Sequence, residues 1–204
     1  MGLKHLNGET RDVVVVGGSA GALGPLKRIV ADLPPNLAAA MLVVLHLNPS
    51  STTILAQILN RLGGPPAVTP EDGDPLLPGC IYVASPDLHL DVSTGAIQNS
   101  KGPKVNGARP AIDVLFQSAA ETYGPRVVGV ILSGGLDDGS AGLAAIREAG
   151  GIGIVQHPDD AAVGSMPRNA IKRAQPEYVA LVDDIGGIIS RIVGPPAGVN
   201  RPGT

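Results

Sequence analysis

The chain has 204 residues, which is the length of one domain with a full hydrophobic core. Its formal charge is −3 at pH 7 and its isoelectric point is about 5.7, which argues against a nucleic-acid partner, because phosphate binding needs a basic surface. One cysteine excludes a disulfide within the chain and fits a reducing compartment, and no apolar stretch is long enough to span a membrane. We therefore expect a cytoplasmic protein without membrane insertion.

The composition indicates an α/β fold. The chain carries 28 glycines, 19 prolines, no tryptophan and one phenylalanine, so its core must consist of Ala, Val, Leu and Ile. Strands joined by short Gly- and Pro-rich connections are typical of doubly wound proteins. We predict a single doubly wound, mostly parallel sheet with helices on both faces and a small antiparallel hairpin. This domain should occupy residues 11–193, between a flexible arm (1–10) and a flexible tail (194–204).

Two buried strands are predicted early in the chain. Four consecutive valines indicate a strand over 13–17 that is buried on both faces, as in a parallel sheet. Helical spacing predicts a helix over 22–32, and a second apolar run predicts a strand over 41–46. Residues 50–53 can cap a further helix, whose apolar face starts at Ile54.

The middle of the chain predicts shorter elements. We expect a short strand over 67–69, followed by two runs over 81–84 and 88–92. The second run alternates and indicates a half-exposed strand in a hairpin-like element, with His89 on the surface. Residues 99–109 should form a loop. The remaining predicted elements, in order, are a helix over 111–123, a strand over 127–132, a helix over 140–149, a strand over 152–156, a helix over 166–174, a strand over 179–182 and a helix over 185–193.

Ser19 follows the first predicted strand in the pattern Gly17-x-Ser19-x-Gly21, and three interpretations compete for it. A serine on a strand–turn–helix corner is typical of the nucleophile elbow of hydrolases. The same glycines resemble a dinucleotide-binding loop. They also suit a close contact between helix and strand without further function.

The second strand favours a catalytic interpretation. A dinucleotide site needs an acidic residue about 20 positions after the loop, and none lies between Asp32 and Glu71. His46 ends that strand instead. The usual hydrolase elbow follows several earlier strands, and here only a dozen residues precede Val13, so the elbow of an ordinary α/β-hydrolase fits poorly.

Polar side chains that follow strand ends should share one rim of the sheet. Ser19, His46 and the pair Asp137 and Asp138 each lie just past the carboxyl end of a predicted strand. A serine, a histidine and a buried carboxylate can together form an activated nucleophile. His157 also follows a strand and is a rival base. No group of residues has the spacing of metal ligands, so we expect no metal site.

An ordered set of short motifs over residues 11–193 resembles the catalytic domain of CheB-type protein-glutamate methylesterases. The set comprises Gly18-Ser19-Ala20-Gly21, Leu45-His46-Leu47-Asn48-Pro49, Glu71-Asp72-Gly73, Ile81-Tyr82-Val83-Ala84, residues 109–116, Val130-Ile131-Leu132-Ser133-Gly134, Asp138-Gly139 and Met166-Pro167-Arg168. The resemblance implies hydrolysis of glutamyl methyl esters on methyl-accepting chemoreceptors, with release of methanol, and deamidation of certain glutamines. It implies no cofactor and no metal. Open alternatives are an esterase with a substrate outside chemotaxis and a non-catalytic interaction domain of the same fold.

The resemblance also assigns roles to residues. It implies Ser19 as nucleophile, His46 as base and Asp138, rather than Asp137, as the carboxylate that orients the base. The backbone N–H groups of Ala20 and Gly135 are candidates for the oxyanion hole. At the substrate rim we expect Arg109, His157 and Met166, although a surface salt bridge explains Arg109 equally well.

Three local departures from the family pattern are visible. Ala20-Gly21-Ala22 replaces Thr or Ala followed by two glycines, Gly135-Leu136 replaces Met-Gly, and His157-Pro158 replaces a polar pair. The family often carries an N-terminal receiver domain, and we expect none within these 204 residues. We expect a monomer.

Overall fold

A computed structural model describes residues 10–46 and 54–195. Its centre is a seven-stranded sheet in the order β3-β4-β2-β1-β7-β8-β9, and every neighbouring pair is parallel. The strands are β1 (Val13–Gly18), β2 (Ala40–Leu45), β3 (Ala67–Val68), β4 (Ile81–Val83), β7 (Val127–Ile131), β8 (Ile152–Gln156) and β9 (Tyr178–Ala180). A separate antiparallel hairpin consists of β5 (His89–Ser93) and β6 (Ala96–Ser100).

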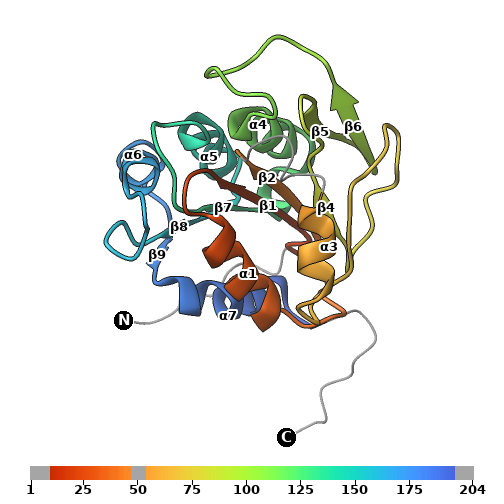
Figure 1. The fold of residues 1–204 in the computed structure, drawn as a ribbon, viewed down its shortest axis with the longest axis horizontal. Helices are drawn as coiled ribbons and strands as arrows, with labels where there is room; N and C mark the ends of the chain where they lie inside the picture. The colour runs from red at the N-terminus through yellow and green to blue at the C-terminus, as the bar shows by residue number, and fades with distance from the viewer. Residues whose placement is uncertain (1–9, 47–53, 196–204) are drawn as a thin grey trace, which may run out of the picture.

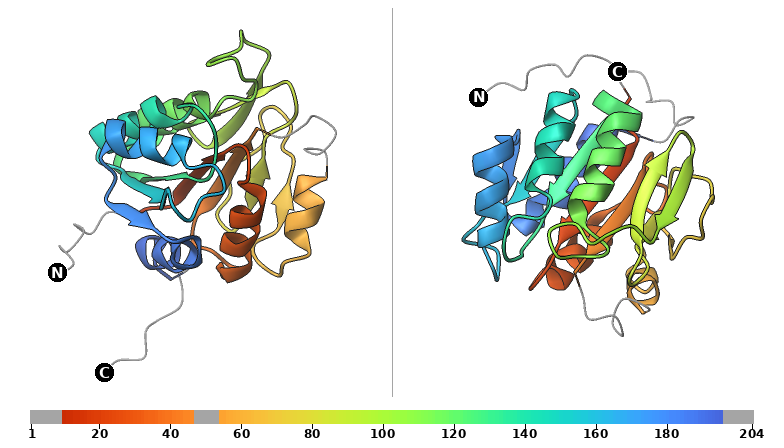
Figure 2. Two further views of the ribbon diagram at one scale, coloured as in Figure 1. Left: turned by 60° about the vertical axis from the view of Figure 1, so that its left-hand side comes forward. Right: turned by 90° about the horizontal axis from the view of Figure 1, so that it is seen from above.

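Helices cover both faces of the sheet (Figures 1 and 2). The helices are α1 (Leu23–Asp32), α3 (Leu55–Asn60), α4 (Ile112–Tyr123), α5 (Ser140–Glu148), α6 (Ser165–Ala174) and α7 (Val182–Val193), with a 3₁₀ turn at Gly124–Arg126. One core lies between the sheet and α1, α3 and α7, and the other lies under α4, α5, α6 and the hairpin. In β1, Val14 and Val16 enter the first core, and Val13 and Val15 enter the second. The valine run is therefore buried on both sides, as a parallel sheet requires.

The predicted fold class is confirmed: the protein is a doubly wound, parallel α/β sheet with a small antiparallel hairpin. None of the helices in the described ranges is long and apolar enough to cross a membrane. The predicted cap over 50–53 and most of both predicted tails lie outside the described residues.

The structure corrects the prediction for the hairpin region. The run over 81–83 joins the main sheet beside β2, and the partner of β5 is β6. Strand β6 ends at Ser100, so the loop predicted over 99–109 starts later than expected. His89, predicted on the surface, is only 2% exposed. The alternation was misleading because the hairpin packs on α4 and because His89 is covered by the segment that follows β6: its Nε2 lies 2.9 Å from the carbonyl oxygen of Pro103.

The last elements also differ from the prediction. β9 ends at Ala180, and α7 starts at Val182 instead of residue 185. Asp183 and Asp184 lie in the first turn of this helix, where negative charge is favourable. The N–H of Val182 donates to Asp160 Oδ2 at 3.0 Å, which fixes the start of the helix.

Candidate active site

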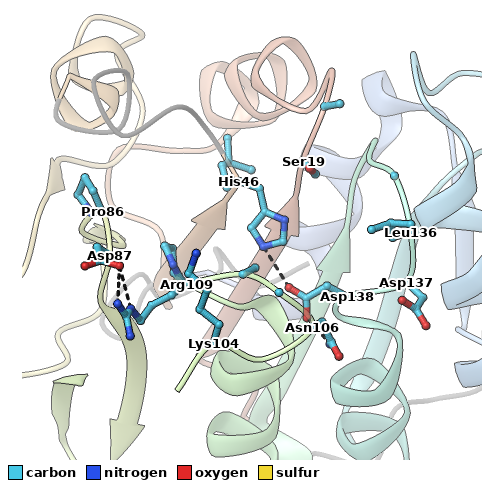
Figure 3. A pocket seen from close by; sticks show the side chains of 16 residues that line it. Ser19, His46, Pro86, Asp87, Lys104, Asn106, Arg109, Leu136, Asp137 and Asp138 are labelled. Atoms are coloured by element: carbon cyan, nitrogen blue, oxygen red, sulfur yellow. Dashed lines mark hydrogen bonds and ion pairs between the residues drawn. The ribbon is translucent and has the colours of Figure 1, made fainter. Parts of the chain in front are cut away.

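A cleft of about 480 Å³ opens at the carboxyl ends of β1 and β2 and beside the segment that follows β7. β1 lies between β2 and β7, and the chain builds the sheet outward from β1 in both directions. This is the topological switch point, where open parallel sheets bind their ligands. Ser19, His46 and Asp138 all line the cleft, and Figure 3 shows the His46 ring directed toward Asp138 with Ser19 beside it.

Ser19 lies in a tight turn between β1 and α1. Its N–H donates to the carbonyl oxygen of Ser133 at 2.9 Å, which ties the turn to the end of β7. A Cβ on Gly18 would lie 2.5 Å from Ala22 Cβ, and one on Gly21, where φ is +80°, would lie 2.7 Å from Ala162 Cβ. The turn therefore requires both glycines. Helix α1 begins without a side-chain cap, so the Ser19 hydroxyl is not engaged in capping it.

His46 follows β2 directly. Its N–H donates to the carbonyl oxygen of Gly18 at 3.0 Å, which places the residue next to the Ser19 turn. Its Nε2 lies 3.0 Å from Asp138 Oδ2, although the ring N–H is not aligned as in a linear hydrogen bond. Catalytic hydrogen bonds are often poorly aligned before substrate binds. The 3.0 Å separation places the ring and the carboxylate within reach of such a bond.

Asp138 is the most firmly held member of the cluster. It is 4% exposed, and the N–H groups of Ile112 and Asp113, at the start of α4, donate to its Oδ2 and Oδ1 at 2.7 and 3.1 Å. Burial by itself raises the pKa of Asp138, but the hydrogen bonds from His46, from Asn106 and from these two N–H groups outweigh it, and the net pKa is lowered. The carboxylate is therefore ionised at neutral pH.

Two residues that the sequence reasoning missed support this carboxylate. Asn106, in the loop between β6 and α4, donates from Nδ2 to Asp138 Oδ1 at 3.0 Å and to Asp113 Oδ2 at 2.8 Å. Asp113 also accepts the N–H of Gly142 at 2.7 Å. Burial raises the pKa of Asp113, and the charge of Asp138 adds to this effect. One amide thus separates two buried carboxylates. The only sequence signal was Asn106-Gly107, which indicates a turn.

The loop that carries Asn106 is anchored at several points. Besides its contact with Pro103, His89 accepts the N–H of Ala111 on Nδ1 at 3.3 Å. Arg109 donates from Nη1 to the carbonyl oxygen of Gly102 at 2.7 Å and pairs with Asp87 at 2.6 Å. These contacts hold both ends of the loop against the hairpin.

The two walls of the cleft differ in character (Figure 3). One wall carries Asp87, Lys104 and Arg109, so Arg109 lies at the predicted rim and also forms the salt bridge that was the alternative interpretation. The opposite wall carries Leu136 and Asp137. Asp137 lines the cleft, but the contacts with His46 and the start of α4 belong to Asp138.

The candidates for the oxyanion hole also line the cleft. The N–H groups of Ser19 and Gly134 are used by the carbonyl oxygens of Ser133 and Val163. Within the described ranges, the N–H groups of Ala20 and Gly135 donate to no other group. They are available for a ligand oxygen.

Two predicted rim residues do not lie at this cleft. Met166 is fully buried, and a Cβ on Gly134 would meet its sulfur at 2.6 Å, so it packs against the segment that follows β7. His157 lines a different hollow, next to β9 and the start of α7, which rules it out as a base for Ser19. It follows β8, two strands away from β1. The ranges that the structure describes contain no group of three His, Cys, Asp or Glu residues that could hold a metal ion.

A doubly wound sheet with a serine, a histidine and a buried carboxylate at its switch point has the arrangement of a serine hydrolase. The family model described as "CheB methylesterase" matches residues 14–189. The chain belongs to the CheB methylesterase family.

Individual proteins agree with this assignment. The chain is 38% identical over 185 residues to the protein-glutamate methylesterase/protein-glutamine glutaminase of Symbiobacterium thermophilum. The match covers 90% of this chain and 51% of that longer protein. A Leptospira interrogans protein named for the same two activities is 35% identical, over 89% of this chain and 94% of that protein. The crystal structure of the Thermotoga maritima CheB methylesterase catalytic domain superposes with a TM-score of 0.84 and 31% identity, over 89% of this chain and 98% of that one.

Proposed function

We propose that the protein hydrolyses methyl esters of glutamate side chains on methyl-accepting chemoreceptors. The observation that carries the proposal is the convergence of Ser19, His46 and Asp138 in one cleft of a chain that belongs to the CheB methylesterase family. Relatives named for both methylesterase and glutaminase activity support glutamine deamidation by the same residues.

The reaction proceeds in two steps. His46 accepts the proton of the Ser19 hydroxyl while its oxygen attacks the ester carbon, and Asp138 stabilises the imidazolium that forms. The oxyanion accepts hydrogen bonds from the N–H groups of Ala20 and Gly135, which donate to no other group in the described structure. The intermediate collapses as His46 protonates the methoxide, so methanol leaves and an acyl group remains on Ser19. Water, deprotonated by His46, then releases the free carboxylate and restores the serine.

A glutamine side chain follows the same course. The leaving group is then ammonia, and the product is again glutamate. Chemoreceptor methylation segments lie in the cytoplasm, so the proposal also places the protein there, acting as a monomer on a helical protein substrate.

The test is methanol release from a methyl-esterified chemoreceptor segment, with native protein and the Ser19→Ala variant. Ser190→Ala is a matched control, because Ser190 lies on α7, on the face of the sheet away from α4. The proposal predicts release by the native protein and the control and loss of about 10³-fold or more in Ser19→Ala. Release that persists in Ser19→Ala would contradict the assignment of the nucleophile. If the native protein cleaves a small ester but releases no methanol from the receptor segment, its substrate lies outside chemotaxis. If it turns over neither the receptor segment nor the small ester, the protein is an interaction domain.

A further inference from the structure

Leu136 combines three features at the mouth of the cleft. Its side chain is 77% exposed, the largest fraction among the exposed large apolar residues of the described ranges. Its φ is +63°, in the left-handed region. It also lines the same cleft as Ser19 and lies between Gly135 and Asp137, two further lining residues.

Neither the exposure nor the backbone conformation benefits the fold. An exposed leucine contributes little hydrophobic stabilisation, because most of its surface stays in water. A left-handed φ costs a leucine free energy that glycine avoids and asparagine reduces. Unfavourable conformations of this kind persist where surrounding contacts impose them, and they cluster at functional sites.

The structure shows what holds Leu136 in place. Asn169 on α6 donates from Nδ2 to the carbonyl oxygen of Leu136 at 2.8 Å. The N–H of Ser140 at the start of α5 donates to the carbonyl oxygen of Asp137 at 3.0 Å. Both contacts hold the backbone carbonyl groups that directly follow the Leu136 side chain, and they keep this part of the chain at the mouth of the cleft.

The surroundings of Leu136 indicate what covers it. Figure 3 shows Leu136 on one side of Ser19 and His46, and the charged group of Lys104, Asp87 and Arg109 on the other. A protein segment that brings a glutamyl side chain to Ser19 must lie across the mouth of the cleft. The exposed side chain of Leu136 then meets the residues next to the reacting one.

We propose that Leu136 is a specificity-determining residue that packs against an apolar side chain of the protein substrate, next to the glutamyl ester. The inference rests on the proposed function, because it concerns the substrate of the same site. It assigns the substrate an apolar residue on the Leu136 side of the reacting glutamate. The exposed leucine becomes buried only in the enzyme–substrate complex.

The test compares two substrates and two variants. The substrates are a methyl-esterified chemoreceptor segment and p-nitrophenyl acetate, which is too small to reach beyond the triad. Leu136→Asn removes the apolar group and introduces a residue that tolerates the left-handed conformation, and Leu136→Met keeps an apolar side chain of similar volume.

We expect Leu136→Asn to lower kcat/KM for the receptor segment by about tenfold or more, mainly through KM, since the burial of a leucine side chain is lost. Turnover of p-nitrophenyl acetate should stay within about twofold of native, and Tm should be unchanged or higher. Leu136→Met should restore most of the activity on the receptor segment. A destabilised fold would lower Tm and both activities together, and so produces a different pattern.

Two results would overturn the inference. One is an equal loss of kcat/KM on both substrates, which would show that Leu136 acts through the loop that carries Gly135 and Asp138. The other is an unchanged kcat/KM for the receptor segment in Leu136→Asn. Failure of the proposed function is a separate outcome, because in that case the native protein itself releases no methanol from the receptor segment.

Discussion

Asn106 is predicted to keep two buried carboxylates apart, and its replacement by alanine should affect both stability and catalysis. Its amide is a donor to Asp138 at 3.0 Å and to Asp113 at 2.8 Å. A hydrogen bond to a charged group is worth about 1.5–3 kcal/mol, and here two are lost at once. The loop is exposed, so water replaces part of the interaction. We therefore expect Asn106→Ala to lower the free energy of unfolding by about 2 kcal/mol at pH 8.

The loss of stability should depend on pH with a definite sign. Because the pKa of folded Asp113 is raised above its unfolded value, its ionised form disfavours folding, and this penalty appears as the pH rises through the folded pKa. Removal of the Asn106 donor enlarges the penalty. The destabilisation should therefore be largest above the pKa of folded Asp113 and shrink as pH falls through it.

Catalysis should fall because Asp138 loses one of the two donors to its Oδ1, and the N–H of Asp113 remains as the other. A loss of about 1.4 kcal/mol in transition-state stabilisation corresponds to about tenfold in kcat. Urea unfolding at a series of pH values from 8 down to about 4, close to the usual pKa of an aspartate, measures the stability, and turnover of p-nitrophenyl acetate measures kcat. Asn60→Ala is the matched control, because Asn60 also makes two hydrogen bonds, to Ala67 beside α3 and away from the cleft. The same destabilisation at every pH of the series, or a kcat no lower than that of Asn60→Ala, would refute the reasoning.

Two further predictions follow from the contacts and pKa directions. In Asp138→Asn, an amide replaces the carboxylate that faces the N–H of Ile112 and the ring of His46. We expect kcat to fall by about 10³-fold or more and Tm to decrease. A kcat within tenfold of native would show that Asp138 does not orient the base. Burial raises the pKa of the Cys80 thiol and outweighs the opposite effect of its hydrogen bonds with Tyr82 and Ile81. Iodoacetamide at pH 7.5 should therefore modify Cys80 more slowly than free cysteine, as followed by intact mass, and equal or faster modification would contradict this.

The strand ends of this sheet explain how much of the site was predictable. Ser19, His46 and Asp138 are far apart in sequence, yet each follows a strand at the same edge of the sheet. Hydrophobic runs locate strands, and parallel strands bring their carboxyl ends together, so the pattern alone predicts a shared cleft. His157 shows the limit of this argument, because it also follows a strand but lies beyond the switch point, at the hollow beside β9.

The residues that the sequence did not place correctly are positioned or covered by a loop. Asn106 reaches Asp138 because the segment between β6 and α4 folds back over the sheet edge, and no local periodicity encodes that path. His89 was placed on the surface because alternation assumes one solvated face, whereas the loop covers that face. The sequence contains a signal for the start of α7, because acidic residues such as Asp183 and Asp184 are favoured in the first turn of a helix. The apolar run over 179–182 nevertheless predicts a strand, and its last residue, Val182, begins the helix instead.

The most direct test of the central claim is covalent labelling by a fluorophosphonate probe, followed by mass spectrometry of the digested protein. We predict one adduct, on the peptide that contains Ser19, because only a serine activated by a histidine reacts at neutral pH, and here Asp138 orients that histidine, His46. The adduct should be absent in Ser19→Ala and should form at least tenfold more slowly in Asp138→Asn. A native protein that remains unlabelled, or that carries the adduct on another serine, would contradict the assignment of Ser19 as an activated nucleophile.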